Sequence, residues 1–143
     1  MTDPLRVLLV EDEALILMQL EALVEDAGHV VVGTAMRCAE AIALAREVRP
    51  DLAFVDLNLC DGESGFVVAH ALGELDGLMV VFVTANPLRV SEDFGGAAGV
   101  IAKPFTRAVV SHGIAYLEEC VRRPPPVTPL PSGMRMAAPY LPR

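Results

Sequence analysis

Short apolar segments alternate along this chain with longer segments whose apolar residues recur at helical spacing. Apolar runs rich in Val, Leu and Ile occupy residues 5–10, 30–34, 52–55, 79–83 and 100–102. Helical periodicity marks residues 14–27, 38–48, 65–75 and 106–122. This alternation predicts a parallel sheet covered by helices on both faces, because each strand is apolar throughout and each helix has one apolar face. We therefore expect a doubly wound α/β fold of five strands and about five helices.

One expected helix has a poor sequence. The segment PLRVSEDFGGAAG, residues 87–99, lies where the fourth helix should form, between the fourth and fifth strands. Gly95, Gly96 and Gly99 disfavour helix because glycine loses more backbone entropy on ordering than other residues. The fourth helix is therefore predicted to be short or frayed.

The C-terminal 20 residues differ from the rest of the chain. Seven of the residues in 124–143 are proline, which excludes helix and makes a strand improbable. We expect a domain over residues 1–123 followed by a flexible or polyproline-like tail over 124–143, with no further domain. A cut linker, a disordered end and a proline-rich docking peptide all remain open for the tail.

Charge and composition exclude several classes of function. The formal net charge is −8, and all 19 acidic residues precede residue 124, which argues against a nucleic-acid surface. Apolar runs are too short to span a membrane, and the N-terminus has no signal-peptide pattern. Three widely spaced cysteines without a CxxC motif fit a reduced, cytoplasmic protein.

Polar residues with reactive side chains follow four of the predicted strands. They are Glu11, Asp12 and Glu13 after the first strand, Asp56 after the third, Thr84 after the fourth and Lys103 after the fifth. Carboxyl ends of parallel strands meet at one edge of the sheet, where ligands of such folds bind. The sequence therefore predicts a site that brings together carboxylates, a hydroxyl and an ammonium group.

These residue types suit phosphoryl transfer. Glu11, Asp12 and Asp56 would repel one another unless a divalent cation lay among them, and oxygen ligands favour Mg²⁺. A carboxylate can attack phosphorus, while Thr84 and Lys103 can neutralise two oxygens of the transferring group. Lys103 is the only lysine in the chain. A compact ammonium fits beside a phosphoryl group better than a broad guanidinium does.

Each of these residues also has a simpler explanation. Acidic residues before a helix often cap it, Asp56 precedes a turn at Asp61 and Gly62, and a single lysine can be an accident of composition. None of these explanations accounts for all the positions falling at the ends of strands in one sheet.

Four stretches of the sequence carry a resemblance to a known family. In chain order they are VLLVEDE, FVDLNL with DG and SG after it, VTAN and GVIAKPF. Over residues 6–122, the chain resembles the receiver domain of two-component response regulators. The resemblance implies a flavodoxin-like sheet of order 2-1-3-4-5. It also implies roles for individual residues. These are Asp56 as phosphoacceptor, Glu11, Asp12, Asp56 and the backbone carbonyl of Asn58 as Mg²⁺ ligands, and Thr84 and Lys103 as phosphoryl-contacting groups.

The resemblance also assigns residues that modulate the site. Ala85 is small in the way that keeps such sites open to a donor, and Asn58 and Asn86 occupy positions that tune dephosphorylation. The peptide bond before Pro104 resembles one that is cis in the family. Val100 is a departure, because many receivers have Tyr or Phe there, and that ring moves together with the switch hydroxyl.

The implied function is a bacterial single-domain response regulator that a histidine kinase phosphorylates. The signal would pass through Thr84 and Lys103 to the face formed by the fourth helix, the fifth strand and the fifth helix. The output would be binding to a protein partner, transfer to a histidine phosphotransfer protein or drainage of phosphate from a shared kinase, with no nucleic acid or membrane contact. It would catalyse only its own phosphorylation and dephosphorylation, and dimer formation is left open. Two alternatives are a pseudo-receiver that binds proteins without phosphate and a phosphohydrolase similar to haloacid dehalogenases. The second is disfavoured, because such enzymes need an aspartate where this chain has Asn58.

Overall fold

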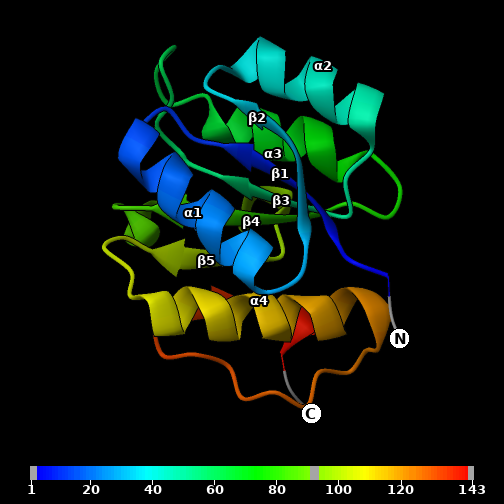
Figure 1. The fold of residues 1–143 in the computed structure, drawn as a ribbon. Helices are drawn as coiled ribbons and strands as arrows, with labels where there is room; N and C mark the ends of the chain where they lie inside the picture. The colour runs from blue at the N-terminus through cyan, green and yellow to red at the C-terminus, as the bar shows by residue number, and fades with distance from the viewer. Residues whose placement is uncertain (1–2, 91–93, 142–143) are drawn as a thin grey trace.

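The computed structural model describes residues 3–90 and 94–141, which form one sheet with helices on both faces (Figure 1). The strands are β1 (Arg6–Val10), β2 (Val30–Ala35), β3 (Leu52–Val55), β4 (Met79–Thr84), β5 (Gly99–Ala102) and β6 (Met134–Met136). They lie in the order β2-β1-β3-β4-β5-β6. The first five are parallel and confirm the predicted doubly wound order. The sixth strand is antiparallel and was not predicted.

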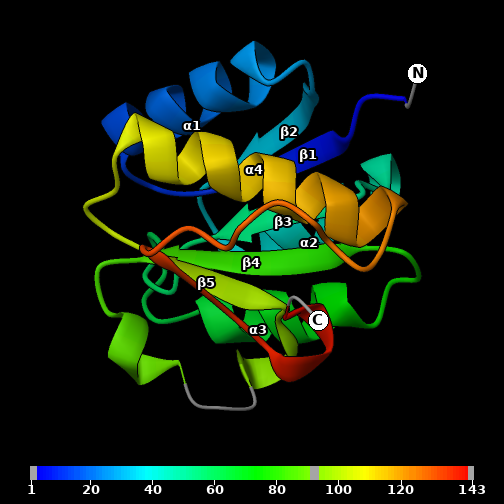
Figure 2. The ribbon, with the colours of Figure 1, turned by 90° about the horizontal axis from the view of Figure 1, so that it is seen from below.

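The helices lie in two layers, one on each face of the sheet. They are α1 (Ala14–Asp26), α2 (Cys38–Val48), α3 (Gly65–Gly73) and α4 (Arg107–Arg122). Helices α1 and α4 cover one face, and α2 and α3 cover the other (Figure 2). Among the described residues, none of these helices is both long enough and apolar enough to cross a bilayer.

Both faces of the central strands are buried. In β1, Val7 and Leu9 pack toward α1 and α4, while Leu8 and Val10 pack toward α2 and α3. Successive side chains of a strand point to opposite faces, so a strand buried on both sides must be apolar at every position. This explains why the strand segments were recognisable as continuous apolar runs.

Between β4 and β5, the residues that the structure describes form two single 3₁₀ turns, η1 (Pro87–Arg89) and η2 (Phe94–Gly96). Gly95 and Gly96 have φ values of 55° and 89°, in the left-handed region that ends helices. The described residues between β4 and β5 form no α-helix. This corrects the prediction of a short or frayed fourth helix. Residues 91–93 of that predicted helix lie outside the described residues.

The structure differs from the expected tail at one place, because Met134–Met136 forms a strand where the prolines made a strand improbable. Met134–Met136 pairs with β5 in a register that places Gly99 opposite Met136 and Ile101 opposite Met134. Met134 and Met136 are buried in the core between the sheet and α4. The prolines did not prevent this pairing, because none of them falls between residues 132 and 138 and the backbone N–H groups of that stretch are free to bond.

Two side chains of α4, those of Glu119 and Tyr116, attach the C-terminal segment by hydrogen bonds. The buried Glu119 carboxylate accepts the N–H groups of Val127 at 2.6 Å and Thr128 at 2.9 Å, and it also accepts the Thr128 hydroxyl. The hydrogen bond from Thr128 is the main reason why the pKa of Glu119 lies below its usual value. The Tyr116 hydroxyl donates to the carbonyl of Tyr140, in η3 (Ala138–Tyr140).

We expect Gly99→Ala to lower the free energy of unfolding by about 1–3 kcal/mol. A Cβ at this position would lie 2.7 Å from the Arg135 carbonyl oxygen and would also overlap the Met136 sulfur, so β6 must move away. Urea unfolding followed by circular dichroism measures the change. Gly73→Ala is the matched control, because its Cβ would meet only the Gly96 carbonyl at an ordinary 3.7 Å. Equal stability of Gly99→Ala and the wild type would show that β6 does not contribute to the fold.

Candidate functional site

The carboxyl ends of β1, β3, β4 and β5 bring the predicted site residues together. Asp56 donates its N–H to the Val10 carbonyl at 2.9 Å, so the residues just after β1 and β3 lie side by side. Lys103 donates its N–H to the Thr84 carbonyl at 2.8 Å. Backbone hydrogen bonds therefore continue past the ends of the strands. They fix the backbone positions from which the side chains of Glu11, Asp56, Thr84 and Lys103 extend.

A buried cluster of two carboxylates and one ammonium group occupies this edge. The Lys103 Nζ lies 2.6 Å from Glu11 Oε1 and 3.1 Å from Asp56 Oδ2. Glu11 is 1% exposed and Asp56 5% exposed, and the Lys103 side chain is 8% exposed. Charges this poorly hydrated are tolerated only when they are paired, so Lys103 is the group that permits two carboxylates in one buried site.

The protonation of Glu11 reflects this burial. Desolvation is the largest effect on its carboxyl group, the Asp56 charge adds to it, and the pKa rises to about 7 despite the hydrogen bond from Lys103. For Lys103, burial opposes the charged form more than any other single effect. The hydrogen bond to Glu11 and the charges of both carboxylates together outweigh burial, and the pKa of Lys103 is raised.

The predicted metal ligands Glu11, Asp12 and Asp56 lie close enough to share one ion. One carboxylate oxygen from each lies within 4.8 Å of the others. Three hard oxygen donors, one of them on a half-buried residue that faces solvent, fit Mg²⁺ with water in its remaining positions. Asn58 is exposed and donates its N–H to Asp56 Oδ1 at 3.3 Å. The predicted role of the Asn58 backbone carbonyl as a Mg²⁺ ligand stays a prediction.

Thr84 is fully buried, and its hydroxyl oxygen accepts the N–H of Asn86 at 3.0 Å. The hydroxyl therefore has a proton free to donate if a phosphoryl oxygen comes within reach. The neighbouring Ala85 and Asn86 are exposed, and the peptide bond before Pro104 is cis. The cis bond confirms the prediction for Pro104, and the effects predicted for Ala85 and Asn86 stay predictions.

Val100, the position at which related domains often have an aromatic ring, is buried within β5. A hollow of about 250 Å³ lies beside it, between η1 and β6, and Pro87 and Leu88 form its wall on the η1 side. In the β5–β6 ladder, Val100 lies opposite Arg135. A residue of the C-terminal segment therefore lies next to the position where the family usually has a ring.

Gly65 is a residue of the site that sequence reasoning did not single out. It begins α3 and donates its N–H to the Leu57 carbonyl at 3.0 Å. A Cβ at this position would overlap the carbonyl oxygen of Asp56 and the Cα of Leu57. Only glycine lets α3 start this close to Asp56, and the SG pair after the FVDLNL motif was the signal for it.

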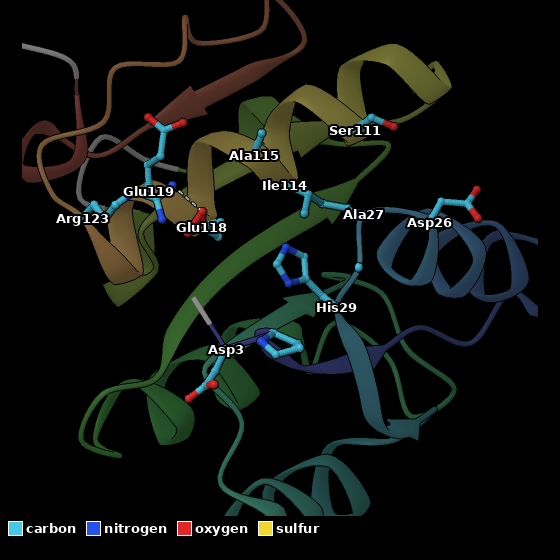
Figure 3. A pocket seen from close by; sticks show the side chains of 12 residues that line it. Asp3, Asp26, Ala27, His29, Ser111, Ile114, Ala115, Glu118, Glu119 and Arg123 are labelled. Atoms are coloured by element: carbon cyan, nitrogen blue, oxygen red, sulfur yellow. Dashed lines mark hydrogen bonds and ion pairs between the residues drawn. The ribbon is translucent and has the colours of Figure 1, made fainter. Parts of the chain in front are cut away.

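A hollow of about 590 Å³ lies at the opposite end of the sheet, between α4 and the loop that follows α1 (Figure 3). Its charged lining is mostly acidic and includes Asp26, Glu118 and Glu119. Arg123 is paired there with Glu118 at 2.6 Å. His29 accepts the Leu5 N–H through Nδ1, and burial lowers its pKa. An acidic lining repels phosphoryl groups, so this hollow does not suit the chemistry of the strand-end site.

An apolar groove of about 350 Å³ lies between α1 and the segment after β5. Leu15 and Met18 of α1 are 68% and 66% exposed along it. Phe105, two residues after Lys103, forms part of its wall, and Arg107 lies at its rim. Large apolar side chains exposed side by side are typical of surfaces that bind other proteins.

Comparison with known proteins places the chain among signalling domains. Residues 7–115 match the sequence model of the response regulator receiver domain. The phyllosphere-induced regulator PhyR of Methylorubrum extorquens is 40% identical over 82% of this chain and 46% of its own length. The polar-differentiation response regulator DivK of Brucella anthropi is 35% identical over 72% of this chain and 87% of its own. The chain spans about half the length of the curated relatives it matches first.

Solved structures agree with these matches. The receiver domain of PhyR from Erythrobacter litoralis superposes with a TM-score of 0.69 at 36% identity, over 78% of this chain and 88% of the other. PhyR of Bartonella quintana, solved in complex with the anti-sigma factor NepR, superposes with a TM-score of 0.53 at 35% identity. That match covers 55% of this chain and 33% of the other.

We expect the affinity for Mg²⁺ to rise about tenfold between pH 6 and pH 8 and then to level off. Glu11 must lose its proton to bind the ion, and its pKa of about 7 means that the proton competes below neutrality. Isothermal titration calorimetry at several pH values measures the trend. Glu11→Gln should bind Mg²⁺ weakly at every pH, whereas Glu13→Gln, an exposed neighbour, should retain the wild-type profile. An affinity that does not change with pH would contradict the role of Glu11 as a ligand.

Proposed function

Because this chain belongs to the response regulator receiver family, as the match over residues 7–115 shows, we propose that Asp56 accepts a phosphoryl group from a histidine kinase in a magnesium-dependent step. The observation that carries the proposal is the buried cluster of Glu11, Asp56 and Lys103 at the strand ends. A carboxylate held beside an ammonium group, with two further carboxylate ligands for a cation, is the arrangement that phosphoryl transfer to aspartate requires.

Asp56, Lys103 and Thr84 have different roles in this step. An Asp56 carboxylate oxygen forms the new O–P bond as the P–N bond of the kinase phosphohistidine breaks, and the electron pair of that bond stays with the imidazole. Lys103, already 3.1 Å from Asp56, remains as a positive charge beside the phosphoryl oxygens. The Thr84 hydroxyl turns toward one of these oxygens and donates to it. Bound Mg²⁺ supplies the remaining charge neutralisation.

The apolar groove beside the site is the proposed docking surface for the kinase. Leu15, Met18 and Phe105 expose apolar surface within a few residues of Glu11 and Lys103. An amphipathic helix that carries the phosphohistidine could bury its apolar face there. Kinases of this kind take their phosphoryl group from ATP inside the cell, so the proposal places the chain in the cytoplasm.

The proposed output is binding to another protein. The similar Bartonella quintana PhyR was solved with a protein partner, the anti-sigma factor NepR. The chain's acidic charge of −8 gives no support for a nucleic-acid partner. Under this proposal the chain acts only on its own phosphoryl group. Turnover of free phosphate esters would favour a phosphohydrolase instead, and partner binding that persists in Asp56→Ala would favour a pseudo-receiver.

We expect incubation with acetyl phosphate and Mg²⁺ to add one phosphoryl group to the wild type and none to Asp56→Asn. The asparagine side chain keeps the shape but lacks the nucleophilic carboxylate. Intact-protein mass spectrometry detects the increment. Asp76→Asn is the matched control, because Asp76 is an exposed carboxylate in the turn before β4, at the opposite end of the sheet, and should leave the increment in place. An increment in Asp56→Asn, or none in the wild type, would sink the proposal.

We expect Met18→Glu to slow phosphotransfer from the cognate histidine kinase at least about tenfold while leaving phosphorylation by acetyl phosphate unchanged. The substitution places a charge in the groove that the kinase helix would fill, but it does not touch Asp56. Radiolabel transfer from each of the organism's autophosphorylated kinases measures the rate. Val67→Glu on α3, where the side chain is 56% exposed, is the matched control. Equal losses in both variants would place the kinase elsewhere.

A further inference from the structure

The edge of β5 is occupied by the chain's own C-terminal segment. Met134–Met136 runs antiparallel to β5, and hydrogen bonds flank the pair at both ends. Ala102 donates its N–H to the Gly133 carbonyl at 3.1 Å, and Ala137 donates its N–H to the Ala98 carbonyl at 2.7 Å. Figure 2 shows the chain leaving α4, returning along this helix and then lying beside β5. An unpaired strand edge binds extended peptides, and here that peptide is internal.

Arg135 attaches the segment to the neighbouring turns. Its guanidinium donates through Nη2 to the carbonyl oxygens of Pro87 and Val90, each at 3.0 Å. The same guanidinium lies 4.9 Å from the centre of the Phe94 ring, within the range of a cation–π contact. Two carbonyls and an aromatic face, supplied by the segment that replaces the fourth helix, therefore form a receptor for one arginine.

The receptor is also shaped for the residues on either side of that arginine. Gly99 and Gly113 leave the space that Met136 and Met134 fill, because a Cβ on either glycine would press against a methionine sulfur. Met134 and Met136 are 6% and 4% exposed. The β5 edge thus accepts an extended segment with an arginine between two apolar residues.

Two contacts connect this receptor to the phosphorylation site. Ala102, which bonds to Gly133, directly precedes Lys103. On the other side, the N–H of Asn86 bonds to the Thr84 hydroxyl, and the next residue is Pro87, whose carbonyl accepts from Arg135. When the Thr84 hydroxyl turns toward a phosphoryl group, Asn86 loses its acceptor and η1 is free to move. The carbonyls that bind Arg135 would move with η1.

We propose that the β5 edge is a docking surface for a partner protein's extended segment in which an arginine lies between two apolar residues, and that residues 133–137 occupy it until Asp56 is phosphorylated. The proposal rests on the function proposed above. The internal segment is tethered to α4 and so has the advantage of high local concentration. A partner can compete only when that advantage is offset. Movement of η1 carries the carbonyls of Pro87 and Val90 beyond the reach of the tethered Arg135, whereas a partner's untethered segment can follow them.

The first test follows amide hydrogen exchange in the full chain, with and without acetyl phosphate and Mg²⁺, while intact mass reports the phosphorylated fraction. Phosphorylation should speed exchange of the Ala102 and Ala137 amides about tenfold or more, because both lose their acceptors. The Val30 amide, bonded to Leu5 at the far edge of the sheet, should not change. Full phosphorylation with unchanged exchange at Ala102 and Ala137 overturns the inference alone. Absence of phosphorylation overturns both proposals.

The second test uses a fluorescent peptide of residues 131–140, PSGMRMAAPY, as the probe. Phosphorylated full-length chain should bind it roughly tenfold or more tightly than unmodified chain, and an Arg135→Ala peptide should lose most of this binding. In the full chain, Arg135→Ala should bind the wild-type peptide without phosphate, whereas Arg123→Ala, which removes the pair with Glu118, should behave as wild type. Equal peptide binding in both phosphorylation states, or none in either, overturns the proposal.

A second copy of this chain carries the same segment and is the competing occupant. Light scattering after phosphorylation separates the two cases. A chain that stays monomeric and binds the peptide supports a partner segment. A chain that doubles in mass and excludes the peptide overturns that choice in favour of exchange between copies.

Discussion

The ion pairs of Lys103 with Glu11 and Asp56 are the interaction on which the site depends. Two carboxylates at 1% and 5% exposure could not remain together without a positive charge or a cation. The ammonium group allows the strand-end edge to be acidic before a cation binds, and the raised pKa of Glu11 shows that the compensation is incomplete. The Glu11 carboxyl group is thus balanced between its two protonation states near neutral pH.

Strand β5 connects this charge balance to the rest of the molecule. Lys103 follows its last residue, Val100 lies in its middle, and its outer edge pairs with β6. In a receiver with a full fourth helix and an aromatic ring near the lysine, the ring and the helix connect the site to the surface. This chain has 3₁₀ turns and a valine in those places, and Arg135 makes the contacts that join the turns to β5.

The match to the family ends at residue 115, within α4. The segment that fills the β5 edge therefore lies beyond the part of the chain that the family model describes. Its contacts are nonetheless specific, since Glu119, Tyr116 and two glycines of the domain are arranged around it.

The sequence alone determined the alternating strands and helices, their order and the set Glu11, Asp56, Thr84 and Lys103. It did so because strands buried on both faces must be continuously apolar and because strand ends converge. Tertiary structure alone decided the conformation of the C-terminal segment and its position beside β5. Its prolines predict disorder locally, but the free edge of β5, the space beside Gly99 and the carbonyls that receive Arg135 come from distant parts of the chain. Only folding places these next to a three-residue strand that has no stability of its own.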